Sequence, residues 1–134
     1  MAQAKRFSFP KSKRLVSNRQ FKAVLDRRLA VSDQLLLLNI AANDLGCRRL
    51  GISVGKSCGN AVVRSRLKRL LREAFRQSQD QIPAGLDYLL MISPQWLRKF
   101  NTSAEVKEAV KCLKLEQVQV SFLVLAKRAA GKIK

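Results

Sequence analysis

The chain has 134 residues, 47% of them hydrophobic and 27% charged, which fits one folded domain over 1–134 and excludes a disordered basic tail. Its 27 Lys and Arg residues outnumber 9 Asp and Glu, giving a formal net charge of +18. Such an excess repels itself in a compact fold, so we expect a polyanionic partner, nucleic acid first and an anionic membrane surface second.

Several protein classes are disfavoured by composition. The chain has no His, which excludes Ser–His and Cys–His nucleophile pairs and His-containing metal sites. Its scattered carboxylates disfavour a metal-dependent nuclease with clustered acids, and three cysteines match no metal-binding spacing. Apolar runs at 35–38 and 122–126 are too short to span a membrane, and no secretory signal is evident, so a cytoplasmic location is expected.

The first element is a basic arm over 1–14, which either stays solvated or contacts phosphates. A helix is then predicted over residues 18–28. Ser17 and Gln20 form an S-x-x-Q capping box, and Phe21, Val24 and Leu25 give an apolar stripe at i, i+3 and i+4. On spacing alone, Phe21 is a core residue.

Two strands should follow. The apolar run 35–42 is predicted as a strand, and 43–46 as a turn. Residues 48–54 alternate between apolar and polar, which predicts a second strand, paired with the first as an antiparallel hairpin. Its polar face carries Gly51 and Ser53, small residues that leave room for a helix or a ligand.

The long helix beginning near Asn60, a favourable N-cap residue, is the most informative element. The preceding Gly55-Lys56-Ser57 is not a Walker A loop, because Leu50 stands where that loop needs glycine; its amides could still hold a phosphate. The helix has an apolar stripe of Val63, Leu67, Leu70, Leu71 and Ala74. Its other face has one acid, Glu73, among six cations: Arg64, Arg66, Lys68, Arg69, Arg72 and Arg76. Solvent-exposed helix faces usually carry both positive and negative side chains. The excess of cations on this face therefore predicts a bound polyanion.

The rest of the chain should complete an α/β fold. Residues 86–92 read as a strand, so the strand–helix–strand crossover should join two parallel strands, right-handed by the general rule. A short turn or helical piece at 95–100 and a helix capped by Thr102 and Glu105 follow. Residues 118–126 either extend that helix or form a late strand, and the basic tail 128–134 is expected to fray.

The stretch LGISVGKSCGNAVVRSRLKRLLREAFR closely resembles the signature of the bacterial ribonuclease P protein component. That pattern is a strand ending in a Gly-x-Ser-Val-x-Lys-Lys-like sequence, followed by Gly-Asn-Ala-Val-x-Arg-Asn-Arg-x-Lys-Arg and Arg-Glu. The resemblance extends through RLVSNRQFKAVL and PAGLDYLLMISP, over residues 14–115. Ser57 and Ser65 replace the family's second Lys and its Asn. Leu25 and Leu38 stand where the family tends to have aromatic residues, leaving Phe21 as the main stacking platform.

The resemblance implies an α/β sandwich with a small mixed sheet, a left-handed crossover, and N- and C-terminal helices. It also implies the accessory protein subunit of an RNA-based endoribonuclease that removes the 5′ leader of precursor tRNA. The RNA and its divalent ions, magnesium, would carry the chemistry, with no catalytic residue from the protein. The catalytic RNA would meet a basic face of Lys56, Asn60, Arg64, Arg66, Lys68, Arg69 and Arg72. The leader would meet Lys13, Arg14, Phe21, Lys22 and Leu25.

Two other functions are weighed against this one. A basic ribosomal protein would share the composition and differ only in the motif. A self-sufficient nuclease would need the clustered carboxylates or the His that this chain lacks. Arg64 and Arg66 are expected to pair with phosphate oxygens through bidentate guanidinium contacts. The sequence indicates no residue that positions a metal.

Overall fold

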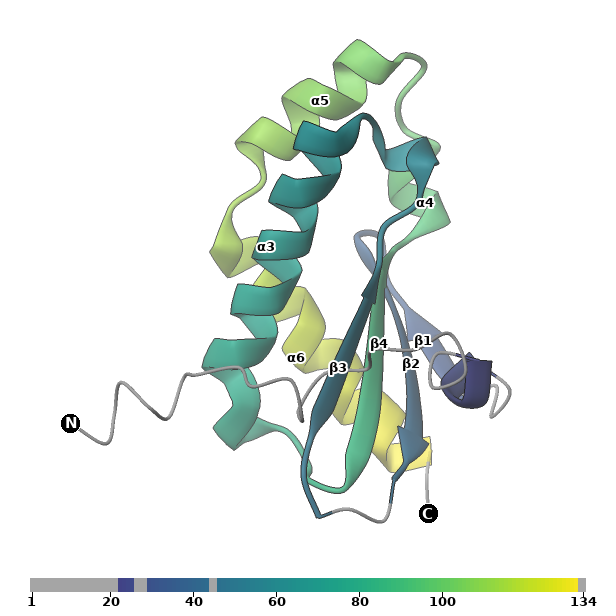
Figure 1. Ribbon diagram of the computed structural model, residues 1–134, viewed down its shortest axis with the longest axis vertical. Coiled ribbons are helices and arrows are strands. Elements are labelled where there is room, and N and C mark those ends of the chain that lie inside the picture. The colour runs from purple at the N-terminus through teal and green to yellow at the C-terminus, as the bar shows by residue number, and fades with distance from the viewer. Residues whose placement is uncertain (1–21, 26–28, 44–45, 133–134) are drawn as a thin grey trace, which may run out of the picture.

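The computed structural model describes residues 22–25, 29–43 and 46–132. Figure 1 shows a four-stranded sheet with two long helices, α3 (Ala61–Ser78) and α6 (Leu115–Lys132), on one face. Residues 22–25 are helical, as predicted, and lie on the other face, where Val24 packs against the sheet. The ends of the predicted first helix, with Ser17, Gln20 and Phe21, lie outside the described residues. The mixed α/β architecture is confirmed.

The sheet order differs from the predicted hairpin. The strands are β1 (Ala30–Ser32), β2 (Leu36–Ala42), β3 (Arg49–Ser53) and β4 (Leu86–Ile92), arranged β1-β2-β4-β3. β2 pairs antiparallel with β1 and with β4, while β3 pairs with β4 in parallel. The predicted pairing of 35–42 with 48–54 is therefore wrong. β4 is apolar and buried on both faces, which suits a central position, whereas the partly exposed β3 suits an edge.

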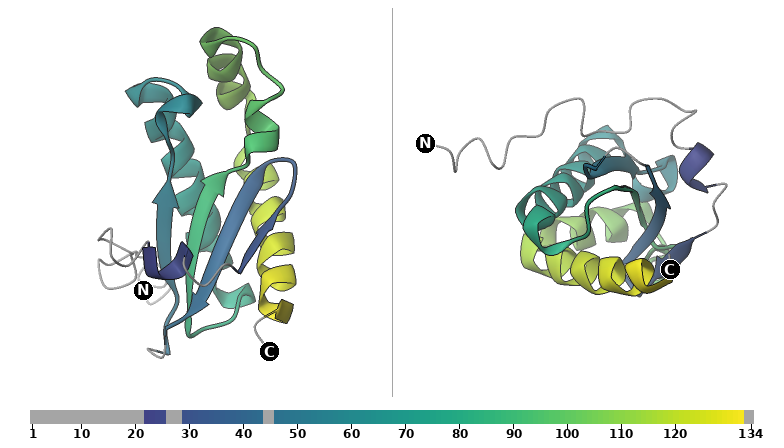
Figure 2. Two further views of the ribbon diagram at one scale, coloured as in Figure 1. Left: turned by 90° about the vertical axis from the view of Figure 1, so that its right-hand side faces the viewer. Right: turned by 90° about the horizontal axis from the view of Figure 1, so that it is seen from below.

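The crossover β3–α3–β4 joins parallel neighbours, as predicted from the strand–helix–strand order. In the left view of Figure 2 the helices lie behind the sheet, both strands point upward, and β4 stands to the right of β3. That arrangement is left-handed. It agrees with the family resemblance and departs from the right-handed rule for parallel crossovers.

The core between sheet and helices is built on three aromatic rings. Phe75 of α3, Tyr88 of β4 and Phe122 of α6 are all fully buried, and their ring centroids lie 5.8, 5.9 and 6.0 Å apart in tilted or edge-on pairs. This is a favourable aromatic geometry. Burial raises the pKa of the Tyr88 hydroxyl, which donates to the Pro83 carbonyl oxygen.

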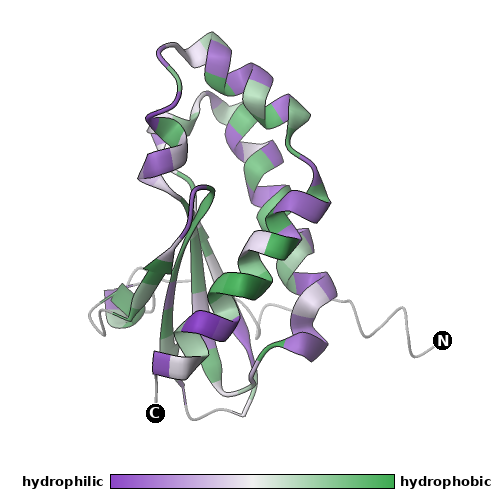
Figure 3. Ribbon diagram, turned by 180° about the vertical axis from the view of Figure 1, so that it is seen from behind, coloured by the Kyte–Doolittle hydropathy of each residue, from purple (hydrophilic) through white to green (hydrophobic). Residues whose placement is uncertain are grey.

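The C-terminal part is helical to near its end. After α4 (Pro94–Leu97), α5 (Ser103–Cys112) begins at the predicted cap, where the Thr102 hydroxyl accepts from the Glu105 amide. The open alternative at 118–126 is resolved as helix, within α6. The part of the basic tail up to Lys132, which was expected to fray, is helical; Ala129 is buried and Arg128 donates to the Ser32 carbonyl oxygen. Figure 3 shows hydrophobic and hydrophilic residues alternating along α6. No helix of the described part is long and apolar enough to cross a membrane.

Candidate nucleic-acid interface

The turn between β3 and α3 places a lysine beside the start of the long helix. The chain passes through the short helix η2 (Lys56–Cys58) and then Gly59, whose φ is +124°. A Cβ at Gly59 would lie 3.1 Å from the side chain of Val63, so glycine is needed for both backbone conformation and space. Asn60 then caps α3, its side-chain oxygen accepting from the Val63 amide at 3.1 Å. Lys56 remains exposed.

Cys58, buried beneath this turn, gives a first testable prediction. Its side chain is 2% exposed, and burial raises the pKa of its thiol, whereas Cys112 at the end of α5 is exposed. The rate of alkylation depends on the fraction of thiolate and on how easily the reagent reaches the sulfur. We therefore expect iodoacetamide at pH 8 to modify Cys112 at least tenfold faster than Cys58. Peptide mass spectrometry over time measures this, and in urea the two rates should converge. Equal rates in the folded protein would contradict it.

The outward face of α3 is a cationic surface. Lys68, Arg69 and Arg72 are exposed, and no ion pair is recorded for them within the described part of the chain. The one acid of the helix, Glu73, accepts from Arg76 at 2.5 Å, and this hydrogen bond lowers the pKa of the Glu73 carboxyl. Glu73 is therefore already paired with a cation, and the remaining positive charge faces solvent.

Arg64 and Arg66, which are both expected to bind phosphate oxygens, lie on different sides of α3. Each residue of an α-helix turns the chain by about 100°, so residues two positions apart stand about 200° apart around the axis. Arg64 lies on the side of α3 near Cys58, and its Nε is buried with no hydrogen-bond partner among the described residues. Arg66 lies on the other side, where it contacts α5. Its Nε and Nη2 donate to the carbonyl oxygens of Val110 and Lys111, each at 3.1 Å. The motif thus serves two surfaces.

The opposite face of the sheet carries the second predicted site. Val24 is buried against Ala41 and Leu89, while Lys22 is exposed and Leu25 is 44% exposed. Gly51 pairs with Leu89 in the register, so the glycine-bearing face of β3 belongs to the sheet face that receives this helical turn. The sequence left open whether a helix or a ligand approaches the Gly51 and Ser53 face of β3. In the structure a helical turn lies on this face of the sheet. Lys13, Arg14 and Phe21 lie outside the described residues.

An ion pair that the sequence analysis missed fixes one end of the sheet. Asp87, 6% exposed, accepts from Arg49 Nε and Nη2 at 2.7 Å each and from Asn43 Nδ2 at 2.8 Å. Asn43 also donates to the Cys47 carbonyl oxygen. This network ties β4 to β3 and to the segment joining β2 and β3. The signal available was a lone acid in the apolar strand LDYLLMI, because buried acids need partners.

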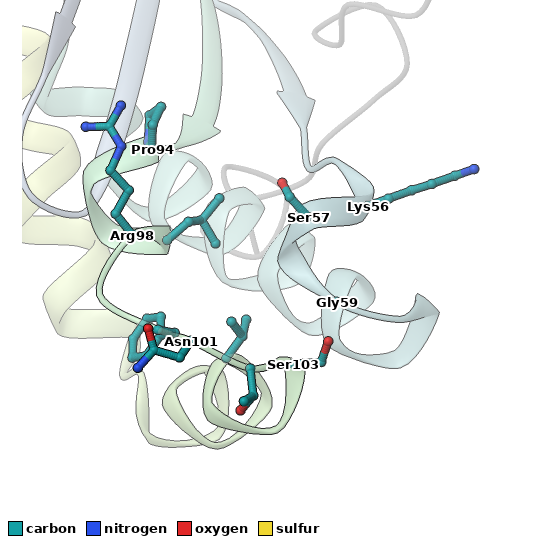
Figure 4. Close-up of a pocket in the computed structure, with 11 residues that line it drawn as sticks. Lys56, Ser57, Gly59, Pro94, Arg98, Asn101 and Ser103 are labelled. Carbon is teal, nitrogen blue, oxygen red and sulfur yellow. The ribbon is translucent and has the colours of Figure 1, made fainter.

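A hollow of about 490 Å³ separates η2 from the segment that joins α4 and α5. Figure 4 shows that the Lys56 ammonium and Arg98 guanidinium groups point away from its centre, so the hollow lacks converging charges. In the described part of the chain, no three His, Cys, Asp or Glu side chains form a group that could hold a metal ion. The candidate interface is therefore the exposed cationic surface of α3 and its surroundings.

Comparison with known proteins agrees with the motif. The family model described as Ribonuclease P matches residues 9–119. The ribonuclease P protein component of Brevibacillus brevis is 38% identical over 120 residues, covering 89% of this chain and 84% of that protein. Among solved structures, the RNase P protein of Thermotoga maritima superposes with a TM-score of 0.71 at 26% identity, covering 86% and 96% of the two chains. The RNase P protein of Staphylococcus aureus superposes with a TM-score of 0.68 at 28% identity, covering 89% of this chain and 96% of that protein.

Proposed function

Because the chain belongs to the ribonuclease P protein family, we propose that it binds the catalytic RNA through the cationic surface of α3 and supports removal of the 5′ leader from precursor tRNA. The single observation that carries this proposal is the exposed charge of Lys68, Arg69 and Arg72, which have no recorded ion pair among the described residues, beside a carboxylate that is hydrogen-bonded to Arg76. Exposed cations at this density bind phosphates mainly by releasing counterions. The cytoplasm, where precursor tRNA is made in bacteria, is the proposed location.

The chemistry is assigned to the RNA and its magnesium ions. The chain has no His, and the described residues provide no acidic cluster suited to a divalent ion. The protein's part is to bind and orient two RNAs. The basic ribosomal-protein alternative is disfavoured because the family model covers residues 9–119.

Reconstitution tests the proposal directly. Precursor tRNA would be incubated at low magnesium concentration with the protein alone, a bacterial ribonuclease P RNA alone, and both together. We expect cleavage at the mature 5′ end to be enhanced only in the mixture, because bound protein neutralises RNA phosphates that otherwise repel. Enhancement of the RNA by an unrelated basic protein to the same degree, or cleavage by the protein alone, would contradict it.

We propose that the leader binds on the sheet face that carries residues 22–25, opposite α3 and α6. Lys22 offers a charge for a phosphate, and Leu25, 44% exposed, offers an apolar contact for a base. The partly exposed Leu37 and Met91 and the exposed Ser53 form one cross-strand row on this face. This surface is separate from the outward face of α3.

The combined substitution Lys22→Gln and Leu25→Ala is expected to reduce the preference for precursor over mature tRNA roughly tenfold, since one charge-assisted contact and one apolar contact are lost. Competition binding to the reconstituted holoenzyme measures this ratio. A matched control is Lys127→Gln with Val124→Ala on α6, where Val124 is 47% exposed. An unchanged ratio in the first variant, or an equal loss in the control, would refute the assignment.

A further inference from the structure

Arg66 joins the long helix to its neighbour. α5 lies beside the N-terminal half of α3 (Figure 1), and the Arg66 guanidinium donates to the Val110 and Lys111 carbonyl oxygens at 3.1 Å. Carbonyls in the last turn of a helix have no partner within that helix, and a cation there also stabilises the negative end of the helix dipole. Arg66 therefore holds the C-terminal end of α5 against α3.

The helix that Arg66 holds has a lysine face. Lys107 and Lys111 stand at i and i+4 and therefore share one side of α5, Lys114 follows just after the helix ends, and all three are exposed. No ion pair is recorded for them within the described residues. The two acids of α5 form no recorded ion pair with this face within the described residues: Glu105 accepts a backbone hydrogen bond at the N-terminal cap, and Glu108, three residues before Lys111, takes part in neither of the recorded ion pairs.

The lysine face meets the start of α3 at a small hollow. A hollow of about 260 Å³ lies between the first turns of α3 and α5, with Lys56 on one wall and Lys107 on the other. α3 has no acid in its first turn. The N-terminal ends of both helices carry partial positive charge, which disfavours lysine and favours an anion. Glu105 complements the start of α5, and an anion bound in this hollow would also stabilise Lys56, Lys107 and the start of α3.

We propose that α5 is a second contact helix for the catalytic RNA, in which Lys107 and Lys111 bind phosphates of the same RNA region that meets the cations of α3. Arg66 is a positioning residue that holds α5 beside α3. Lysine suits this role because its compact charge binds backbone phosphates without reading sequence. The inference rests on the proposed function, since it takes the catalytic RNA as ligand.

The first test removes charge while keeping the helix. The variant Lys107→Gln with Lys111→Gln would be compared with Lys127→Gln and Lys132→Gln, two exposed cations of α6. We expect the α5 variant to bind a transcribed bacterial ribonuclease P RNA at least tenfold more weakly at 150 mM salt, with a salt dependence shallower by about two released counterions. The α6 variant should change affinity less than about threefold, because distant surface charges are screened.

The outcomes separate this inference from the proposed function. If wild-type protein binds the ribonuclease P RNA no better than an unrelated RNA of equal length, the proposed function fails. If wild-type binding is specific and the α5 variant matches wild type, or the two variants lose affinity equally, the α5 contact alone is overturned.

The second test asks whether Arg66 acts through α5. Arg66→Ala would be made in wild-type protein and in the Lys107→Gln, Lys111→Gln background. If Arg66 positions the lysines, its removal costs affinity in wild type but at most about twofold in the background, because the contacts that it supports are already gone. Hydrogen exchange should also become faster in α5 of Arg66→Ala while β4 stays protected. Independent, additive losses or unchanged exchange in α5 would overturn the positioning role.

Discussion

Replacing Lys68, Arg69 and Arg72 together by glutamine is expected to weaken binding of the catalytic RNA by roughly 100- to 1000-fold at physiological salt, as three charge-assisted contacts of about 1–1.5 kcal/mol each are lost. These side chains are exposed and have no recorded ion pair within the described part of the chain. Glutamine keeps helix propensity and length, so the fold should remain. Filter binding or fluorescence anisotropy across a salt series measures both affinity and the number of counterions released.

The matched control removes three exposed cations elsewhere, Lys99, Lys127 and Lys132, by the same substitution. Both variants have the same net charge, so a difference between them reports the α3 surface and excludes a general effect of charge. We expect the control to lose less than about fivefold. Equal losses would show that the RNA responds only to net charge, and the α3 interface would then be rejected.

Local features of the fold were readable from the sequence. Asn60 caps α3 and Thr102 caps α5 because capping depends on side chains within three or four residues of the cap. The buried face of α3, which includes Val63, Leu67 and Leu71, follows from helical periodicity alone. The motif and these local signals together were sufficient for the family and for the parallel crossover.

Non-local pairings were not readable. The sequence placed 35–42 beside 48–54 because neighbouring strands usually pair, whereas the doubly buried β4 takes the position between them. β1 was missed because three residues, Ala-Val-Ser, carry too little pattern to be recognised before β2 is in place. The buried face of the last turns of α6 likewise depends on the sheet that it covers.

The candidate site divides in the same way. Exposure of Lys68, Arg69 and Arg72 follows from the helix period, so sequence and structure agree there. The different surroundings of Arg64 and Arg66 do not follow from the helix period, since Arg66 donates to two carbonyls of α5 that lie 44 and 45 residues further along the chain. A motif that is continuous in the sequence is thus divided by the fold between an exposed cationic surface and a side chain that joins two helices.

Asp87→Ala is expected to destabilise the protein by about 3–5 kcal/mol, because it leaves the Arg49 guanidinium without its bidentate partner in a largely buried position. The side chains of Arg49 and Asp87 are only 17% and 8% exposed, and Asp87 also accepts from Asn43. The hydrogen bond to Asp87 raises the pKa of Arg49. Because a guanidinium stays protonated in proteins even without a partner, losing the carboxylate leaves a charged arginine in this position. Urea unfolding followed by circular dichroism measures the change.

The control removes both charges. Arg49→Met with Asp87→Leu should recover most of the stability lost in Asp87→Ala, since replacing a buried ion pair by apolar side chains is often neutral. The Arg49–Asp87 ion pair would then specify how β3 and β4 align while contributing little net stability. If the double variant is as unstable as Asp87→Ala, the pair itself stabilises the fold. If Asp87→Ala costs less than about 1 kcal/mol, water reaches Arg49 and the site is not buried in solution.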